Sequence, residues 1–347
     1  MNGTGALNST LDMLDMESIG NSTQDSYLWT YHDIIKGTIS SIFTIVIIFG
    51  NLICLIALKR IQIKRPTRIL MYSLNAADLC VGIFLAFPTA AASFVNAWIF
   101  GYWGCFIVVI IGGAPYYTSN WTLLAIAVER YIAVTRPLRY RVIFTASRAR
   151  LIVISIWVAS HFYEVLVCGL NQFQVYFHPP TDTCWSLGLG KSDFFIKISV
   201  MILIFGPFVA FIVLYFRIFG IIRQQNAIRR EMTKLASIEN NRHDHRGVSA
   251  NDTKMAKTFM IITFAFFLST CPVTVNYILE VATGRGSNQW LYFFTFVTSM
   301  SNAWLNSLIY FIRNASFRHC VIELFKCTSP RTKRPTIFSS ISGSVIK

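Results

Sequence analysis

Seven apolar runs of about 20 residues or more constrain this chain more than any other feature of its sequence. A helix of about 20 apolar residues crosses the roughly 30 Å of hydrocarbon in a bilayer. With 54% hydrophobic and only 14% charged residues among its 347, the chain is too apolar for an ordinary soluble fold. The sequence therefore predicts an all-α membrane protein, a bundle of seven transmembrane helices. The runs lie near residues 35–59, 68–93, 102–135, 149–170, 192–222, 254–280 and 288–312.

Lysine and arginine gather in alternate connections between the runs. They follow the first run from Lys59, the third at 136–150 and the fifth at 223–257. Because such residues stay in the cytoplasm, we expect a multi-pass plasma-membrane protein with an extracellular amino terminus. The formal net charge of +15 then faces the inner leaflet of the lipid bilayer and a partner protein. Nucleic acid is not expected as a partner, since no folded basic domain is predicted.

This topology divides the chain into three parts. Residues 1–33 form an extracellular segment, residues 34–312 the seven-transmembrane domain, and residues 313–347 an amphipathic helix and a cytoplasmic tail. The first segment carries three N-x-S/T sequons, which are glycosylation sites only outside the cytoplasm. Their asparagines are Asn2, Asn8 and Asn21.

The cysteines divide by compartment. Cys105 lies at the outer end of the third run and Cys184 in the outer loop after the fourth, both in an oxidising environment, so we predict a disulfide between them. Cys320 and Cys327 follow the last run on a short amphipathic stretch. They are candidate palmitoylation sites, with two ordinary reduced thiols as the alternative.

The third run ends in two adjacent opposite charges, Glu129 and Arg130. An arginine at a helix end can simply extend to the lipid headgroups. Asp252, at the start of the sixth run, supplies a second acid able to pair with Arg130. A contact between helices that is held or released is what a two-state element needs.

Short motifs follow one another in a fixed order along the seven runs. They are FGNLI with Asn51, LNAADL with Asp78, AWIFGYWGC with Trp98, ERY at 129–131, Trp157, Pro207 with Tyr215, Phe266 with Pro272, and NSLIY at 306–310 followed by Phe317. In this joint register the chain resembles the rhodopsin-like, or class A, G-protein-coupled receptors. The resemblance covers all seven runs and implies a receptor, not an enzyme, that activates a heterotrimeric G-protein.

The resemblance implies a switch at the inner end of the bundle. Arg130 would be held by Glu129 and Asp252 at rest, and activation would swing the sixth helix outward. The freed Arg130 would then line the cavity that accepts the terminal helix of the G-protein. The implied switch residues are Glu129, Arg130, Tyr131, Tyr215, Asp252 and Tyr310.

Asp78 lies near the middle of the second run, where an ionised carboxylate without partners costs at least about 3 kcal/mol. Ser119, Asn302 and Asn306 are polar at comparable depths. The resemblance implies that these four residues bind a sodium ion, although Ala303 stands where many members place a serine ligand. The alternative is a protonated, hydrogen-bonded Asp78 without an ion. No other cofactor is expected.

The resemblance also implies a ligand cavity in the outer half of the bundle. Gly112 replaces the aspartate of amine receptors, and Met300 replaces the retinal lysine of opsins. Glu164 and Glu280 are candidates to pair with a cationic ligand, while an internal salt bridge of Glu164, for example to Lys197, is the alternative. We expect a small molecule or a short peptide. The implied lining residues are Tyr116, Glu164, Ser199, Thr270, Thr274, Tyr277, Glu280 and Phe296.

Three departures from the family pattern affect the activation relay. Thr270 occupies the usual place of a tryptophan, Ser307 that of a proline, and Asn120 that of a branched apolar residue. Ser307 restores a backbone donor and allows a straighter seventh helix. The alternative function is therefore an atypical or constitutively active receptor homologue without ligand-gated signalling.

Overall fold

The computed structural model describes residues 31–170, 172–186, 191–239, 250–283 and 288–325. Several residues named above lie outside this described part: Asn2, Asn8, Asn21 and Cys327, together with the side chains of Lys197 and Asp252.

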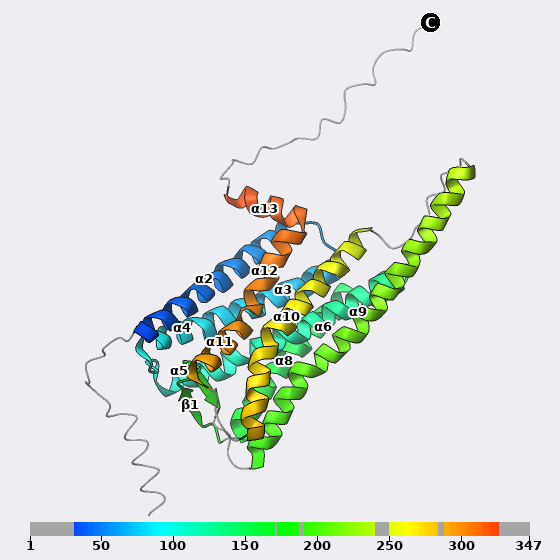
Figure 1. Cartoon of the computed structure of the whole chain (residues 1–347). Coiled ribbons are helices and arrows are strands. Elements are labelled where there is room, and N and C mark those ends of the chain that lie inside the picture. The colour runs from blue at the N-terminus through cyan, green and yellow to red at the C-terminus, as the bar shows by residue number, and fades with distance from the viewer. Residues whose placement is uncertain (1–30, 171, 187–190, 240–249, 284–287, 326–347) are drawn as a thin grey trace, which may run out of the picture.

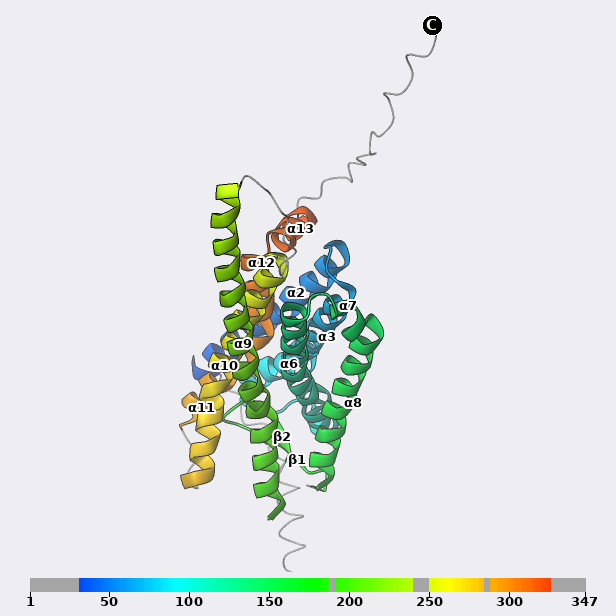
Figure 2. The same cartoon turned by 90° about the vertical axis from the view of Figure 1, so that its right-hand side faces the viewer.

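Long helices lie side by side in one elongated bundle (Figure 1), and the view turned by 90° shows the same packing from its edge (Figure 2). By length and composition, five helical segments are able to cross a membrane. They match the first, second, fourth, fifth and sixth predicted runs. Their bounds are Tyr31–Arg60, Arg65–Val95, Ala146–Leu170, Ile202–Gln225 and Thr253–Glu280.

The third and seventh predicted runs are helical but interrupted. The third consists of α5 (Gly101–Ile107), the π-helical segment η2 (Val108–Gly112) and α6 (Gly113–Thr135). The seventh consists of α11 (Gln289–Met300) and α12 (Asn302–Arg313). Each of these two helices has 12 residues and is about 18 Å long, so only the pair crosses a bilayer. The predicted seven-helix bundle is confirmed.

The remaining elements complete these spans and the connections between them. The fifth and sixth helices extend beyond the apolar part of their runs (Figure 1). The elements are α2 (Tyr31–Arg60), α3 (Arg65–Val81), the π-helical segment η1 (Gly82–Ala86), α4 (Phe87–Val95), α7 (Tyr140–Ile143), α8 (Ala146–Leu170), β1 (Val175–His178), β2 (Thr183–Ser186), α9 (Lys191–Glu239), α10 (Ala250–Thr283) and α13 (Ala315–Phe325).

Each π-helical segment precedes a proline. Proline lacks the backbone N–H of a regular helix turn, and a single wide turn redistributes the remaining hydrogen bonds. Before Pro88, the N–H of Phe87 therefore bonds to the carbonyl of Gly82. Before Pro115, the N–H of Gly113 bonds to the carbonyls of Val108 and Val109. The sequence pattern did not indicate either segment.

The seventh span is interrupted at Ser301. The backbone N–H of Ser301 bonds to the carbonyls of both Val297 and Thr298, which marks a tighter turn between α11 and α12. Helix α12 then runs unbroken through Ser307, as expected of a serine in place of proline. The turn at Ser301 lies six residues before Ser307 and is a separate interruption of the span.

A β-hairpin and helix α13 lie at opposite ends of the bundle (Figure 1). Strands β1 and β2 pair antiparallel, with Phe177 opposite Cys184. A disulfide joins Cys184 to Cys105 of α5, and their Cα atoms lie 5.3 Å apart. The predicted disulfide is thus present. We call this end of the bundle the disulfide end and the opposite one the Arg130 end.

Helix α13 begins where Asn314 adopts an extended backbone conformation. The side-chain oxygen of Asn314 accepts hydrogen bonds from the backbone N–H groups of Ser316 and Phe317, which caps the new helix. Phe317 and Cys320 are buried against the bundle. Since Cys320 is only 6% exposed, an acyl donor would reach its thiol only after α13 moves away from the bundle. The palmitoylation of Cys320 stays a prediction.

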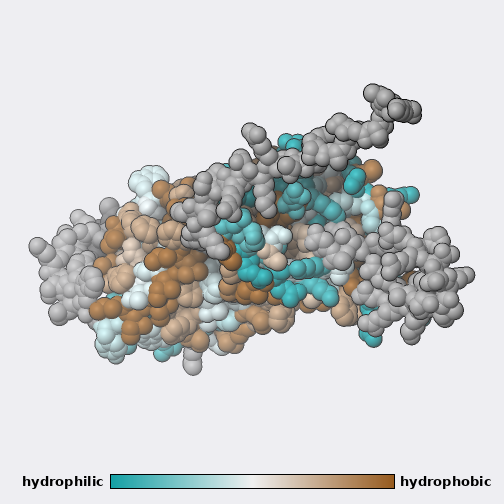
Figure 3. All heavy atoms as spheres, turned by 90° about the horizontal axis from the view of Figure 1, so that it is seen from above, coloured by the Kyte–Doolittle hydropathy of each residue, from teal (hydrophilic) through white to brown (hydrophobic). Residues whose placement is uncertain are grey.

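Polar groups point inward and many apolar side chains outward. Asn51, Asp78 and Arg130 are buried, whereas Phe216 is 80% and Phe162 66% exposed. Figure 3 shows hydrophobic residues over much of one face, with hydrophilic residues gathered in part of it. Such outward apolar surface is suited to lipid, because a bilayer solvates it without cost.

Candidate functional site

The pair predicted at the end of the third run is present on α6. Arg130 and Glu129 are both fully buried and form a bidentate ion pair, in which Nε and Nη2 of Arg130 donate to the two carboxylate oxygens. Thr67 of α3 accepts a hydrogen bond from Nη2 of Arg130 at 2.7 Å and donates one to Oε1 of Glu129 at 2.9 Å. A buried charge pair is retained only with such additional partners.

Tyr140 of the short helix α7 also binds this pair. Its hydroxyl donates to Oε1 of Glu129, and the ammonium of Lys64 lies 4.6 Å above its ring. Burial, followed by the charge of Glu129, raises the pKa of Tyr140, so the phenol remains a neutral donor. Neither Tyr140 nor Thr67 was a sequence-predicted site residue. The one available signal was an aromatic residue amid the arginines of LRYR.

The other switch residues lie around the same end. Met255 of α10 places its sulfur 3.7 Å from Nη1 of Arg130, whereas the predicted contact of Arg130 with Asp252 falls outside the described side chains. Tyr215 accepts a 3.5 Å hydrogen bond from Thr263. Tyr131 is half-buried against the core without touching the ion pair in any described contact.

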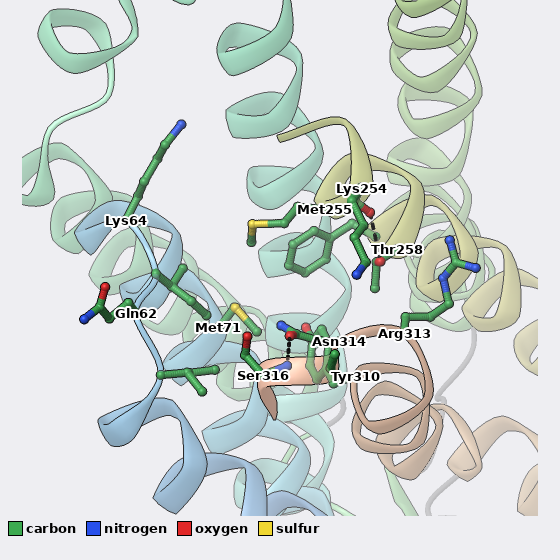
Figure 4. A pocket seen from close by; sticks show the side chains of 14 residues that line it. Gln62, Lys64, Met71, Lys254, Met255, Thr258, Tyr310, Arg313, Asn314 and Ser316 are labelled. Atoms are coloured by element: carbon green, nitrogen blue, oxygen red, sulfur yellow. Dashed lines mark hydrogen bonds between the residues drawn. The ribbon is translucent and has the colours of Figure 1, made fainter. Parts of the chain in front are cut away.

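A cavity of about 230 Å³ opens beside the ion pair at the Arg130 end. Figure 4 shows side chains from the α2–α3 connection, α10 and the α12–α13 corner around it, with Lys64 and Arg313 extending outward at its edge. Met255 lines the cavity and contacts Arg130, so the two features adjoin. The hydroxyl of Tyr310, also in the lining, is buried and makes no hydrogen bond among the described residues. The lining is basic: Lys64, Lys254 and Arg313 contribute three cations.

Two of the three other predicted sodium ligands contact Asp78, while sodium binding itself stays a prediction. Ser119 donates to one of its carboxylate oxygens and Asn306 to the other, each at 2.7 Å. The side-chain oxygens of Asn302 and Asn306 are buried and accept no hydrogen bond from any described residue. Oxygen donors of this kind suit a hard cation. The four residues therefore fit a sodium ion, which would satisfy the two orphaned amide oxygens.

Two departures from the family pattern have structural consequences. Pro207 frees the carbonyl four residues before it in α9, and Asn120 of α6 donates to that carbonyl, of Leu203, at 3.3 Å. Ser307 accepts from Cys54 at 3.2 Å and donates to Asn51 at 3.4 Å. The polar replacements thus tie α6 to α9 and α12 to α2.

The predicted ligand residues fall into separate groups of contacts. The hydroxyls of Tyr116 and Thr270 lie 3.1 Å apart, while the hydroxyl of Thr274 returns to the carbonyl of Thr270. Ser199 lies 2.8 Å from the hydroxyl of Tyr163. The others are distributed around the same half: Glu280 accepts from Tyr292, Phe296 packs near Trp185, Tyr277 is half-buried on α10, and Glu164 is buried on α8.

The β-hairpin is fastened over this half of the bundle by a buried ion pair. Lys36 of α2 lies 3.3 Å from Asp182 in the hairpin turn, and its ammonium lies 5.5 Å above the ring of Phe293. His178 of β1 packs between Trp185 and Tyr292, with ring centroids 5.3 and 5.6 Å away. The hydropathy pattern did not indicate this anchor, because Lys36 lies at the very start of an apolar run, where charged residues are common.

Comparisons with known proteins agree with this architecture. The sequence model of the family described as "7 transmembrane receptor (rhodopsin family)" matches residues 50–310. The thyrotropin-releasing hormone receptor of Gallus gallus is 25% identical over 86% of this chain and 81% of that receptor. Trace amine-associated receptor 8 of Homo sapiens is 28% identical over 83% of this chain and 85% of its own length. Trace amine-associated receptor 8c of Rattus norvegicus is 29% identical over 75% of this chain and 77% of its own length.

The family match covers most of the bundle, including the Asp78 cluster, the Arg130–Glu129 pair and Tyr310. The chain therefore belongs to the rhodopsin family of seven-transmembrane, G-protein-coupled receptors, which are signalling receptors and not enzymes.

Proposed function

We propose that this receptor responds to a small molecule or short peptide at its disulfide end by activating a heterotrimeric G-protein at its Arg130 end. The observation that carries the proposal is the buried Arg130–Glu129 pair beside a basic cavity. A charge pair held by groups from three elements is a contact that can exist in two arrangements. In the resting arrangement the guanidinium is occupied and unavailable to a partner.

Activation requires that Arg130 exchange its partners. Met255 of α10 both touches Arg130 and lines the cavity, so an outward movement of α10 would enlarge the cavity and uncover the guanidinium. Arg130 would then meet the carbonyls and the terminal carboxylate of a docking helix, to which Lys254 and Arg313 add attraction. Asp252 would oppose this movement by retaining Arg130 at rest.

The proposed orientation places the disulfide end outside the cell at the plasma membrane. The disulfide supports it, since such bonds persist in oxidising compartments, and so does the basic character of the opposite end. Epitope tags at residues 1 and 347 test it. Antibody should stain the first tag on intact cells and the second only after permeabilisation; staining of both tags on intact cells would contradict the topology.

The ligand proposal rests on the groups at the disulfide end. Glu164, Glu280 and several tyrosine and threonine hydroxyls offer hydrogen-bonding and charged partners there. The relatives named above are a hormone receptor and amine-associated receptors, and either a short peptide or an amine suits groups of this chemistry. The hairpin anchored by Lys36 would form the roof of the cavity.

The experiment is nucleotide exchange on purified G-proteins of each class by the full-length receptor in lipid nanodiscs, first without ligand and then across a panel of amines and short peptides. Ligand-stimulated exchange on one class supports the proposal. High exchange that no ligand alters supports the constitutively active alternative, and no exchange on any class would contradict both.

A further inference from the structure

Glu164 is a buried acid that has no charge partner among the described residues. Its side chain is only 8% exposed, and no hydrogen bond or ion pair joins its carboxylate to any described residue. Ionised groups within a transmembrane segment are costly and are kept where they meet a charge of opposite sign or a functional ligand. A cation that enters the bundle would supply the missing partner.

The backbone of α6 makes room for this carboxylate. A Cβ atom at Gly113 would lie 2.9 Å from Oε1 of Glu164, so the carboxylate occupies the space that a side chain at position 113 would need. A Cβ at Gly112 would lie 2.8 Å from the carbonyl oxygen of Phe84. Position 112, where amine receptors of the family carry an aspartate, therefore has no space for an acid. Glu164 of the facing helix supplies one at the same level instead.

A group of tyrosines lies near the carboxylate. Tyr117 and Tyr163 lie near enough for the charge of Glu164 to act on their phenols, and their rings meet edge to face with centroids 5.4 Å apart. Tyr116 continues the group, 6.2 Å from Tyr117. Aromatic faces beside a carboxylate attract organic cations, which gain both a charge partner and cation–π contact.

The location is suited to a ligand that enters from the disulfide end. Cys168 lies one helical turn from Glu164 on α8 and packs in a cluster with Cys105 and Cys184. Glu164 therefore lies about one turn below the disulfide and the hairpin. On the far side, the hydroxyl of Tyr163 reaches Ser199 of α9 at 2.8 Å, so that α6, α8 and α9 all border the site.

We propose that Glu164 is the anchor for an organic ammonium ligand, which it holds from α8 against Gly113 and the tyrosines of α6. The inference rests on the proposed receptor function, of which it names the ligand class. The positive charge of the ligand lies beside the carboxylate, to which a primary ammonium also donates a hydrogen bond, and the hydrocarbon portion lies against Tyr117 and Tyr163.

The test measures binding apart from signalling. Thermal stabilisation of the purified full-length receptor in nanodiscs is followed with 2-phenylethylamine and tetramethylammonium, and with 2-phenylethanol and 3-phenylpropionate as neutral and anionic counterparts. We expect the two cations to stabilise the wild-type receptor at concentrations about 10- to 100-fold lower than 2-phenylethanol does. The anionic 3-phenylpropionate should have no effect. Equal stabilisation by amine and alcohol, or none by either cation, would overturn the proposal without any variant.

Variants then locate the anchor. Glu164→Gln keeps the shape of the side chain but removes its charge. It should lower the affinity for the two cations about 10- to 100-fold and leave the affinity for 2-phenylethanol unchanged. Gly113→Ala should act in the same direction, because its methyl group displaces the carboxylate. Glu323→Gln, which removes an exposed acid on α13, is the matched control. If Glu280→Gln abolishes cation binding and Glu164→Gln does not, the anchor is Glu280 and the proposal fails.

Nucleotide exchange on the same samples separates the two proposals. Cation binding that depends on Glu164 without any G-protein activation would contradict the proposed function and leave this inference standing. Ligand-stimulated exchange that is indifferent to Glu164→Gln and to ligand charge would contradict this inference alone.

Discussion

The hydroxyl of Thr67 lies 2.7 Å from Nη2 of Arg130 and so joins α3 to the buried guanidinium of α6. The same hydroxyl donates to Glu129 at 2.9 Å. The arrangement of the buried pair therefore depends on a residue of a second helix, α3, as well as on the two charges of α6. Release of Arg130 requires that this bond break.

Thr67→Val should raise ligand-free signalling. The substitution keeps the volume and removes the hydrogen bonds of Thr67 with both Arg130 and Glu129. A net loss of about 1–2 kcal/mol corresponds to roughly a 5- to 30-fold shift in population towards the released form. Second-messenger output at matched surface expression measures it. Thr89→Val is the control, since the hydroxyl of Thr89 is buried without a hydrogen-bond partner in the described structure. Unchanged output in Thr67→Val would remove Thr67 from the switch.

Tyr140→Phe should also raise basal output, because it removes the phenol that donates to Glu129. Thr67 and Tyr140 share the acceptor Oε1 of Glu129, so their effects should not add. A double-mutant cycle on basal signalling should give a coupling of about 0.5–2 kcal/mol. Strict additivity would indicate that the two residues act independently.

Sodium should stabilise the receptor through Asp78. Replacing potassium by sodium at constant ionic strength should raise the melting temperature and lower basal nucleotide exchange, because the ion favours the resting state. Asp78→Asn should abolish both effects by removing the charge to which Ser119 and Asn306 donate. The site is ruled out if the variant and the wild type respond equally.

Acid should open the β-hairpin through His178. Burial lowers the pKa of His178 to about 4, below the 6.5 of an exposed histidine. The closed hairpin therefore disfavours the proton, and its stability, complete above about pH 6.5, is lost as the pH falls towards 4. Asp182 has the opposite effect on the pH dependence of hairpin stability, because burial raises the pKa of its carboxyl group. Lys36 and Ser93 partly offset that rise.

Hydrogen exchange of residues 175–186 measures this opening between pH 7 and 4. Protection should fall in the wild type and depend less on pH in His178→Asn, which keeps a polar side chain that does not titrate in this range. An identical pH profile in the two proteins would assign the change to other groups.

Much of the bundle follows from the sequence because the bilayer permits few alternatives. Backbone groups in lipid must bond within helices, so apolar length alone predicted the spans. Compartment chemistry predicted the pair Cys105–Cys184, and the scarcity of polar residues at mid-membrane depth drew attention to Asp78 and its neighbours. Each of these inferences rests on one strong local constraint.

What the sequence did not indicate depends on contacts between distant segments. Thr67 and Tyr140 are ordinary residues until folding places both against Glu129. Lys36 reads as a flanking charge until the hairpin turn delivers Asp182 to it. The role of Gly113 as space for Glu164 likewise appears only when α6 and α8 are packed together. Periodicity and spacing carry no information about such pairings.

Nucleotide exchange by Arg130→Ala, in nanodiscs with purified G-protein, tests the central claim most directly. Arg130 is proposed both to hold the resting contact with Glu129 and to meet the G-protein. The variant should therefore bind the ammonium probes with unchanged affinity but show basal and stimulated exchange close to that of empty nanodiscs. Arg150→Ala, an exposed arginine at the start of α8, should exchange like the wild type. Normal exchange by Arg130→Ala at equal receptor concentration would contradict the account and leave Arg130 a structural residue at a helix end.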